Sequence, residues 1–436
     1  MLITPTKTTS TAGKELVQKL LNRFQEADVG CRNGVAEILS AVRDKGDAAL
    51  LEYTRKFDAP DFEINQLRVR GEEIDRARTE VDGQFLETLS LAVERLQLFH
   101  EQELEKSWTI TRDDGVITGR LIRPVAAAGL YVPGGRGGQT PLVSSVLMNG
   151  IPAGIAGVGK RVMVTPPNER GEVHPALLVA AAEIGIEEIY KVGSAWAIAA
   201  LAFGTETVPR VDVIVGPGNQ FVAEAKQQVA GIVGLDMIAG PSEVLIIADH
   251  TANPLYIAAD MLAQAEHDPQ ALAMLVTTSP EIADQAVQEL EHQLQELSRS
   301  DIARKALEER GAVLIAENVE EAINLANDIA AEHLELMLAR PDSWLDSIKH
   351  AGAIFLGDYS PEAAGDYLAG PNHVLPTMGT ARFSSSLGVE TFIKKSSIIS
   401  YSRRALLEDG PHIMALANLE GLSAHAKSVA IRMKEN

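Results

Sequence analysis

The spacing of hydrophobic positions changes near residue 125, and this change separates parts of the chain with different predicted structure. Before it, apolar residues recur three and four positions apart between polar or charged ones, which is typical of helices with one buried face. These helices are predicted at residues 16–24, 35–50 and 85–99. After it, short runs rich in Val and Ile alternate with Ala-rich stretches. That alternation predicts parallel strands connected by crossover helices.

Two successive series of strands and helices follow from this pattern. The first has predicted strands at residues 127–132, 161–165, 188–192 and 211–215, and helices near 174–183, 195–203 and 219–232. The second has predicted strands at residues 244–248, 273–277, 313–315 and 353–356, and helices at 257–266, 281–297 and 319–336. Each series predicts one doubly wound domain.

The C-terminal part of the chain departs from the alternating pattern. Residues 363–376 read AAGDYLAGPNHVLP, have neither helical nor strand periodicity, and are predicted to form a loop. Beyond residue 377, polar loop and strand precede a helix at about 416–434, and this tail is too short for a core of its own.

The predicted fold is therefore α/β, with two doubly wound, Rossmann-like domains, a helical N-terminal segment and a small C-terminal tail. The predicted division is 1–30 for the N-terminal segment, 31–124 with 239–377 for the first domain, 125–238 for the second, and 378–436 for the tail.

Composition narrows the class of protein. The 436 residues are 46% hydrophobic and 23% charged, as in ordinary globular proteins with room for two or three cores. Because 60 acidic residues outnumber 39 basic ones, the net charge of -21 disfavours binding to nucleic acid. One cysteine, Cys31, excludes an internal disulfide and a Cys-rich zinc site. With Thr and Lys in the first residues and no run of 18 apolar residues, we expect a cytoplasmic protein that does not bind membranes.

Several polar residues have side chains that bind metals. Gln264 and His267 lie three apart in AADMLAQAEHDP, so a helix would present both on one face. Asp366, His373 and His425 add oxygen and nitrogen donors, and such a set without cysteine suits catalytic zinc. Each residue alone also has an ordinary structural interpretation: a polar helix end, a loop held by His373, or a core or surface histidine at 425.

The adjacent pair Glu332–His333 suits acid/base chemistry. A carboxylate can take a proton from water, and an imidazole can take one from a hydroxyl near neutral pH. The pair is predicted to close the helix NLANDIAAEHLEL, where neighbouring side chains diverge by about 100°. The two would therefore act together if the helix ends there or if a substrate lies across it. A histidine beside a solvated carboxylate is the alternative.

Two glycine-rich segments follow predicted strands. They read YVPGG at 131–135 and GPGN at 216–219, where Asn219 is placed to cap the next helix. No GxGxxG follows a predicted strand, so the usual dinucleotide fingerprint is absent. Each segment is either a tight turn or part of a ligand site, because open α/β sheets bind ligands at the carboxyl ends of their strands.

Taken in order, the motifs of this chain resemble those of the histidinol dehydrogenases, zinc enzymes that oxidise L-histidinol through L-histidinaldehyde to L-histidine with two molecules of NAD. The likeness runs from about residue 30 to residue 430. The segments that carry it are YVPGG at 131, GPGNQFVAEAK at 216, AGPSEVLIIAD at 239, AQAEHD at 263, AEHLEL at 331, AGDYLAGPNHVLPT at 364 and LSAHAKS at 422.

The resemblance implies a role for each matching residue. It implies zinc ligands at Gln264, His267, Asp366 and His425, and a catalytic pair at Glu332 and His333. It implies substrate contacts from the same four ligands, His333, Ser242, His373 and Glu420, and NAD contacts from Tyr131 and Asn219. It also implies a homodimer in which the C-terminal tail reaches the active site of the partner.

The chain departs from the family pattern in two places. It reads GSAWAIAALA where the family usually has GGAQAIAALA, so Trp196 occupies the position of a Gln that contacts the cofactor. The loop PGGRGGQTPL at 133–142 is also unusual. Two other interpretations therefore stay open: a related zinc and NAD enzyme acting on another small polar alcohol such as a sulfonated diol, and a non-catalytic metal-binding scaffold.

Overall fold

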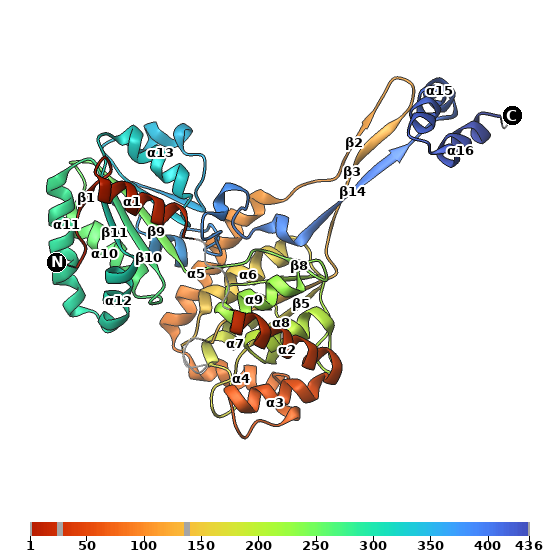
Figure 1. The fold of residues 1–436 in the computed structure, drawn as a ribbon. Coiled ribbons are helices and arrows are strands. Elements are labelled where there is room, and N and C mark those ends of the chain that lie inside the picture. Colours follow the sequence, from red (N-terminus) through yellow and green to blue (C-terminus); the bar gives the residue numbers. More distant parts are fainter. Residues whose placement is uncertain (1, 24–28, 135–139, 435–436) are drawn as a thin grey trace. The chain divides into compact units, whose positions relative to one another are not determined.

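A computed structural model of the chain describes residues 2–23, 29–134 and 140–434. Its first sheet has six parallel strands in the order β1-β11-β10-β9-β12-β13 (Figure 1). Their bounds are β1 Thr6–Lys7, β9 Glu243–Ala248, β10 Leu272–Thr277, β11 Ala312–Ile315, β12 His333–Met337 and β13 Ala353–Leu356. From β9, the strands β10 and β11 are added on one side, whereas β12 and β13 are added on the other, so the strand order reverses between β9 and β12. His333, the first residue of β12, pairs with Val244 on β9 and with Ala353 on β13.

Helices cover both faces of this sheet, as the nearly continuous apolar character of its strands requires. Strand residues that alternate in direction belong to two different cores: Val244 and Ile246 to one, Leu245 and Ile247 to the other. The first core includes residues of α10 (Pro254–Ala265), α11 (Pro280–Gln293) and α12 (Ser300–Arg310). The second includes residues of α1 (Thr11–Leu21) and α13 (Val319–Ile329). This is one doubly wound domain.

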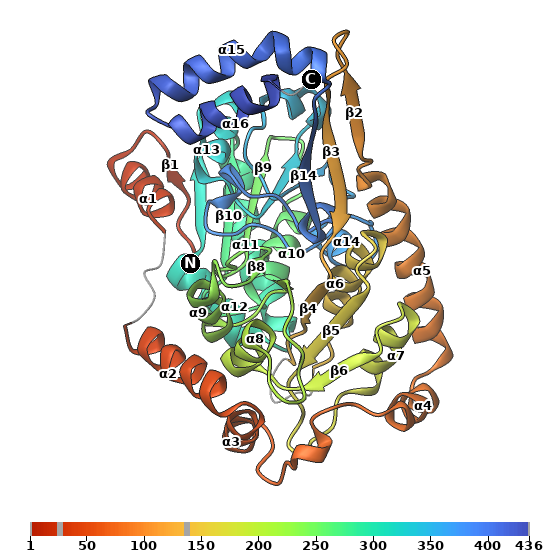
Figure 2. The ribbon, with the colours of Figure 1, turned by 90° about the vertical axis from the view of Figure 1, so that its right-hand side faces the viewer.

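The second sheet repeats the same topology. Its five parallel strands follow the order β6-β5-β4-β7-β8 (Figure 2). Their bounds are β4 Ala127–Tyr131, β5 Lys160–Thr165, β6 Glu188–Lys191, β7 Val213–Val215 and β8 Gly234–Leu235. If the strands of each series are numbered along the chain, both sheets read 3-2-1-4-5, with β1 added at the edge of the first.

The helices of the second sheet also form two groups. One group shares a core with Val162 and Ile214 and consists of α2 (Val29–Lys45), α3 (Asp47–Phe57), α8 (Ser194–Phe203) and α9 (Gln220–Val229). The other consists of α6 (Val143–Ile155), which contacts β4 and β5, and α7 (Pro175–Glu183), with α5 (Gly83–His100) packed on α6 and α4 (Gly71–Glu80) on α7. The predicted α/β class with two Rossmann-like domains is confirmed.

Residues 104–125 and 393–436 form a separate compact unit. Its antiparallel sheet has the order β14-β3-β2. The strands are β2 (Trp108–Thr111), β3 (Ile117–Pro124) and β14 (Ile393–Ser400), and the helices α15 (Arg403–Leu419) and α16 (Ser423–Lys434) pack on each other. The single predicted helix at 416–434 is thus two helices. In the described part of the chain, no helix has both the length and the apolar composition needed to cross a membrane.

Two predicted elements differ from the structure near the polar clusters. The helix predicted at 319–336 ends at Ile329, because Ala330 adopts a left-handed conformation with φ of 52°. His333 is therefore the first residue of strand β12, which lies between β9 and β13, and Glu332 immediately precedes the strand. The segment predicted as a loop from residue 363 overlaps a short helix, α14 (Glu362–Tyr367), that carries Asp366.

The packing also groups the segments differently from the predicted division. Helices α2 and α3, which were predicted to share a domain with residues 239–377, share their core with the second sheet. Strand β1, from the N-terminal segment, joins the first sheet beside β11. The predicted tail also includes a partner from earlier in the chain, since β14 pairs with β3 from residues 117–124. Tertiary packing rather than order along the chain decides these associations.

Asp58, directly after α3, provides a test of this packing. Burial raises the pKa of its carboxyl to about 7, and its Oδ2 atom has no hydrogen-bond partner among the described residues. Because folding favours the protonated form, Asp58 costs nothing below about pH 4 and destabilises the protein progressively as the pH rises towards 7. We expect Asp58→Asn to raise the free energy of unfolding by about 1–2 kcal/mol at pH 8 and by almost nothing at pH 4.

Urea unfolding of Asp58→Asn and wild type at both pH values measures this difference. Asp61→Asn is the matched control, because Asp61 lies three residues away and is exposed. A gain of equal size at pH 4 and pH 8 would show that the carboxyl of Asp58 is not the destabilising group.

Candidate active site

Glu332 and His333 are held by the backbone of one residue, Glu243, at the start of β9. The His333 Nδ1 atom lies 3.0 Å from the carbonyl oxygen of Glu243, and the N–H of Glu243 donates to Glu332 Oε2 at 2.8 Å. Because a carbonyl oxygen can only accept, Nδ1 carries the hydrogen. Nε2 is then the nitrogen with the lone pair, and it is buried with no partner among the described residues. It is the atom available as a base.

Burial sets the protonation of both members of the pair. It lowers the pKa of His333 to about 4, an effect opposed by the Glu243 carbonyl and increased by the nearby His267 and His373. It raises the pKa of Glu332 well above its usual value, against the opposing hydrogen bond from the Glu243 N–H. His333 is therefore a neutral imidazole near neutral pH, which is the form that accepts a proton.

A second cluster lies beside this pair. One ligand atom from each of His267, Glu362 and Asp366 lies within 4.8 Å of the others. Gln264 joins them: with its amide nitrogen facing Glu362, it donates to both carboxylate oxygens at 2.9 and 3.0 Å. The amide oxygen of Gln264 then stays available as a ligand. Glu362 Oε1 is also 3.8 Å from His333 Nδ1, so the cluster and the pair are in contact.

Short-range structure brings these side chains together. Gln264 lies in the last turn of α10, and His267 follows two residues beyond the end of that helix. Glu362 and Asp366 are four residues apart on α14 and share one face of it. Helices α10 and α14 contact each other. Three of the four predicted metal ligands are thus brought to one place.

The charges of this cluster favour a bound cation. Burial, and then the carboxylates of Asp366, Glu332, Glu335 and Asp260, raise the pKa of Glu362 well above its usual value. Burial also raises the pKa of Asp366 to about 6. Carboxylates crowded away from water are unfavourable unless a positive charge compensates them. Oxygen and imidazole donors without sulfur fit zinc in a catalytic site.

Glu362 and Glu243 are two residues of the site that were not predicted from the sequence. The sequence signal for Glu362 was its spacing of four from Asp366, but α14 has six residues, too few for a helical period to be visible. Glu243 acts on the pair through its backbone, which leaves no side-chain signal.

The remaining predicted substrate residues fall in two places. Ser242 immediately precedes Glu243, and the Nε2 atom of His373 is buried without a partner among the described residues. Glu420 immediately follows α15 and His425 lies on α16, so both belong to the separate unit, where both are exposed.

The predicted cofactor segments lie at the carboxyl ends of β4 and β7, which pair in the centre of the second sheet. This is the point where the strand order reverses, the usual ligand position in such sheets. Gly216, with φ of 111°, lies so close to Tyr131 that a Cβ atom would be 2.1 Å from the Tyr131 carbonyl oxygen. Asn219 caps α9 by accepting from the N–H groups of Phe221 and Val222, as predicted. The glycine segment is therefore both a tight turn and correctly placed for a ligand.

Trp196 and Tyr131 have structural contacts of their own. The indole of Trp196 is 4% exposed and stacks with Tyr53 and Phe57 at ring distances of 5.9 and 5.5 Å. The Tyr131 hydroxyl accepts from the N–H of Ser194 at the start of α8. Their contact with NAD stays a prediction, and the unusual loop at Arg136 to Gln139 lies outside the described residues.

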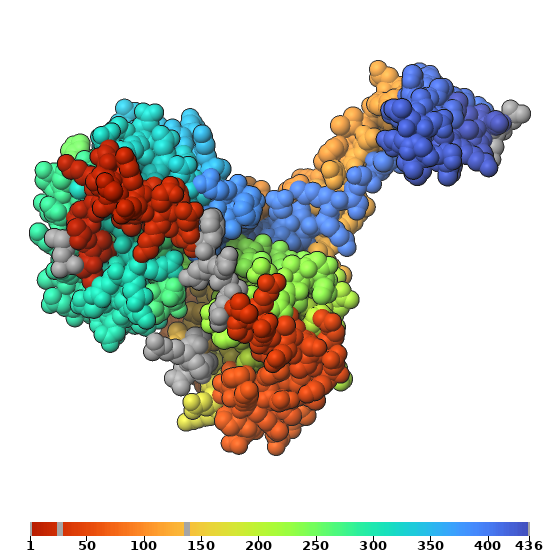
Figure 3. Space-filling view, in the orientation of Figure 1, coloured from red at the N-terminus to blue at the C-terminus, as the bar shows by residue number. Residues whose placement is uncertain are grey.

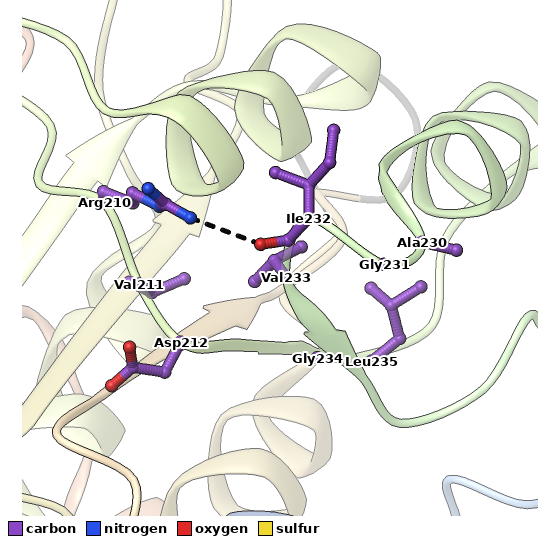
Figure 4. Close-up of a pocket in the computed structure, with 9 residues that line it drawn as sticks. All are labelled: Arg210, Val211, Asp212, Ala230, Gly231, Ile232, Val233, Gly234 and Leu235. Carbon is purple, nitrogen blue, oxygen red and sulfur yellow. Dashed lines mark hydrogen bonds between the residues drawn. The ribbon is translucent and has the colours of Figure 1, made fainter. Parts of the chain in front are cut away.

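A surface cavity of about 530 Å³ lies elsewhere on the second sheet. Figure 4 shows its lining, residues 210–212 and 230–235, with Arg210 donating to the carbonyl oxygen of Ile232. These residues surround the amino ends of β7 and β8, at the opposite edge from Tyr131. The cavity contains none of the predicted site residues.

Glu362 provides a direct test of the metal cluster. We expect Glu362→Gln to lower zinc affinity by about 10–100-fold. The substitution removes the negative charge of the Glu362 carboxylate, and it also removes the two carboxylate oxygens that accept from the Gln264 amide and orient it. Competition with a chelator of known affinity measures this change. Asp260→Asn is the matched control, since Asp260 is another buried carboxylate of the same region but lies outside the donor group. An equal loss in both variants would mean that total charge, not this ligand group, sets the affinity.

The chain was also compared with known proteins by sequence and by fold. A sequence model of the family described as histidinol dehydrogenase matches residues 21–433. The chain is 65% identical over 434 residues to the histidinol dehydrogenase of Desulfotalea psychrophila, covering 100% of both chains. It is 54% identical to that of Nitratidesulfovibrio vulgaris, covering 91% of each. A crystal structure of histidinol dehydrogenase from Elizabethkingia anophelis matches with a TM-score of 0.91 and 39% identity, covering 96% of each chain.

Proposed function

Because the chain belongs to the histidinol dehydrogenase family, we propose that it is the NAD-dependent oxidoreductase that performs the last two oxidations of histidine biosynthesis. It oxidises L-histidinol through L-histidinaldehyde to L-histidine with two molecules of NAD. The observation that carries this proposal is the Glu332–His333 pair held by Glu243 in contact with the Gln264, His267, Glu362 and Asp366 cluster.

Zinc is the metal of this site. Gln264, His267 and Asp366 would hold it together with His425, and Glu362 orients Gln264 from behind. Bound zinc would supply a Lewis acid that helps to orient and polarise the substrate. The buried carboxylates support this assignment because a divalent cation compensates their charge.

His333 serves as the base of the first oxidation. Its Nε2 atom takes the proton of the substrate hydroxyl while the neighbouring carbon transfers a hydride to NAD, which leaves the aldehyde, one NADH and one proton. The Nδ1–H bond to the Glu243 carbonyl orients the ring and stabilises the imidazolium that forms.

Glu332 serves the second oxidation. In its ionised form it takes a proton from water as the oxygen adds to the aldehyde carbon, and the resulting hydrate transfers a hydride to a second NAD. The products are the carboxylate, a second NADH and two further protons. The four-electron oxidation thus needs a base at each stage and water once, and the adjacent pair provides both functions.

The remaining predicted contacts complete the site. NAD binds at the carboxyl ends of β4 and β7, near Tyr131, Asn219 and the segment that carries Trp196. Ser242, His373 and Glu420 contact the substrate.

The enzyme is a cytoplasmic homodimer with shared active sites. The separate unit supports this assembly, because its buried apolar residues are few and mostly alanine: Val116, Ile122, Ala405, Ala417 and Ala426. Many of its large apolar side chains are exposed: Leu104, Trp108, Ile110, Ile399, Tyr401, Leu407, Leu416, Leu419, Leu422 and Ile431. A surface of this kind marks an interface. Association with a second copy would cover it and bring Glu420 and His425 to the partner's cluster.

Complementation tests the sharing of sites. Asp366→Asn and His425→Asn should each be inactive alone, whereas co-expression should restore about a quarter of wild-type activity, since half the dimers are mixed and each has one intact site of two. Activity of the co-purified mixture measures this. No restoration in a dimer shown to be mixed would place both residues of each site on the same chain.

Production of NADH from L-histidinol tests the activity itself. Purified, zinc-loaded protein should form two NADH per histidinol, lose this activity on chelation and regain it when zinc is added. A folded, zinc-bound dimer that oxidises a sulfonated diol instead would establish the related alcohol dehydrogenase, and one that oxidises no alcohol would establish a metal-binding scaffold.

A further inference from the structure

Arg23 lies in the N-terminal segment and is almost completely buried, at 9% exposure. It follows α1, which packs against α13 on the first sheet. Figure 3 shows this segment, coloured red, on the surface of the elements of that sheet. A buried guanidinium in a segment remote in sequence from every predicted site residue needs an explanation, because burying an arginine is costly unless all its charge is compensated.

The guanidinium is compensated by one carboxylate and two carbonyl groups. Nε and Nη2 of Arg23 donate to the two carboxylate oxygens of Glu243 at 2.5 and 2.8 Å. Nη2 also donates to the carbonyl oxygen of Ile329 at 2.9 Å, and Nη1 to that of Leu20 at 3.0 Å. The side chain of Glu243 is 0% exposed. A bidentate pair of this kind restricts both partners more than a single contact does.

Arg23 binds Glu243 and Ile329, and both residues are adjacent to the catalytic pair, one through hydrogen bonds and the other along the chain. Glu243 is the residue whose N–H donates to Glu332 and whose carbonyl accepts from His333. Ile329 ends α13, and the next residue, Ala330, has the left-handed backbone that turns the chain into β12. Such a conformation is unfavourable for alanine and persists only when its surroundings enforce it. Arg23 therefore connects β9, which holds the pair through Glu243, to the turn after Ile329 that leads into Glu332 and His333.

We propose that Arg23 is a positioning residue for the Glu332–His333 pair. It fixes the backbone of Glu243 and the turn after Ile329, so that His333 keeps its Nδ1–H tautomer with Nε2 free, and Glu332 keeps one oxygen on the Glu243 N–H and the other free. Its effect on catalysis rests on the proposed function, whereas its effect on the tautomer does not.

Two other buried ion pairs lack this connection to the catalytic pair. Lys226 pairs with Asp236 and holds Gly216, and Lys191 pairs with Glu73 and holds Gly171. Neither contacts Glu332 or His333. Among the buried ion pairs of the described residues, Arg23–Glu243 is the one whose carboxylate residue hydrogen-bonds to both members of the catalytic pair.

Two variants separate positioning from folding. Arg23→Lys keeps the positive charge beside Glu243 but cannot form the bidentate pair. The double variant Arg23→Gln, Glu243→Gln removes both charges, so that no carboxylate is left buried without a partner. Arg161→Gln is the matched control, because Arg161 is also partly buried and donates to two carbonyl groups, those of Ile184 and Gly185, at the amino end of β5.

We expect kcat for histidinol oxidation to fall by about 10–100-fold in the double variant and by a smaller factor in Arg23→Lys. KM for histidinol and the zinc content should stay close to wild type in both, and Arg161→Gln should keep its kcat. The ¹⁵N chemical shifts of the His333 ring should show the Nδ1–H tautomer in wild type and a mixture of tautomers in the double variant.

A folded, zinc-loaded double variant with wild-type kcat and an unchanged tautomer would overturn the proposal. So would an equal loss of kcat in Arg161→Gln, because that would indicate a general loss of stability. If wild type does not oxidise histidinol, the proposed function fails, but the ring shifts of wild type and the double variant still decide whether Arg23 positions His333.

Discussion

Replacing His333 with Asn lowers kcat for the oxidation of L-histidinol by about 10²–10⁴-fold, the range for loss of a general base. The amide of Asn can still donate to the Glu243 carbonyl in place of Nδ1, so the backbone arrangement at β9 is kept. It has no counterpart of Nε2, the buried ring nitrogen that has no partner among the described residues. The variant should therefore bind zinc normally and fail in proton transfer.

His373→Asn is the matched control for this prediction. Its Nε2 atom is also buried without a partner among the described residues, and burial lowers its pKa to about 4, as it does for His333. Steady-state kinetics with histidinol, together with zinc analysis, measure both variants. If His373→Asn loses kcat by the larger factor while His333→Asn changes little, His373 is the base and the assignment to His333 is wrong.

Replacing Glu332 with Gln separates the two oxidations. Glutamine keeps an oxygen that accepts from the Glu243 N–H, but it cannot take a proton from water. We expect the first hydride transfer to change little and the second to slow by about 10²–10⁴-fold, because the aldehyde is no longer hydrated efficiently. The variant should consequently accumulate aldehyde.

A rapid-quench single turnover with excess NAD measures the two hydride transfers in turn. Wild type should form two NADH per site, and Glu332→Gln should form one quickly and the other slowly. Added histidinaldehyde in its hydrated form should bypass the defect. Equal slowing of both phases would mean that Glu332 does not activate water and instead supports the first step or the geometry of His333.

The two sheets share one strand order but are used at opposite ends. In the second sheet, the predicted cofactor segments follow the carboxyl ends of β4 and β7, where parallel sheets commonly bind ligands. In the first sheet, His333 and Glu243 begin their strands, and Gln264 lies at the end of a helix that returns from the carboxyl edge. The acid/base pair is therefore at the amino edge. There the N–H and carbonyl groups of Glu243, the first residue of β9, hold the catalytic side chains.

Local sequence determined the two α/β units and several individual site residues. Alternation of Val-rich runs with Ala-rich helices specified two doubly wound units, because strands buried on both faces need continuous apolar residues. The three-residue spacing placed Gln264 and His267 together near a helix end, and Asn219 was recognisable as a cap because its side chain acts within its own turn. Each of these signals depends on residues close to each other in the chain.

Tertiary structure alone decided how the catalytic pair is held. Helix α13 ends because Ala330 adopts a left-handed conformation, and no glycine in the sequence indicates this helix end. The chain then continues through Glu332 into β12, which begins at His333 and pairs with β9 and β13, strands formed by other segments of the sequence. Glu243 acts through backbone groups that every residue type except proline has. Arg23 reaches it across 220 residues. Periodicity and motifs report local backbone geometry and side-chain type, whereas these contacts arise only when separate segments pack together.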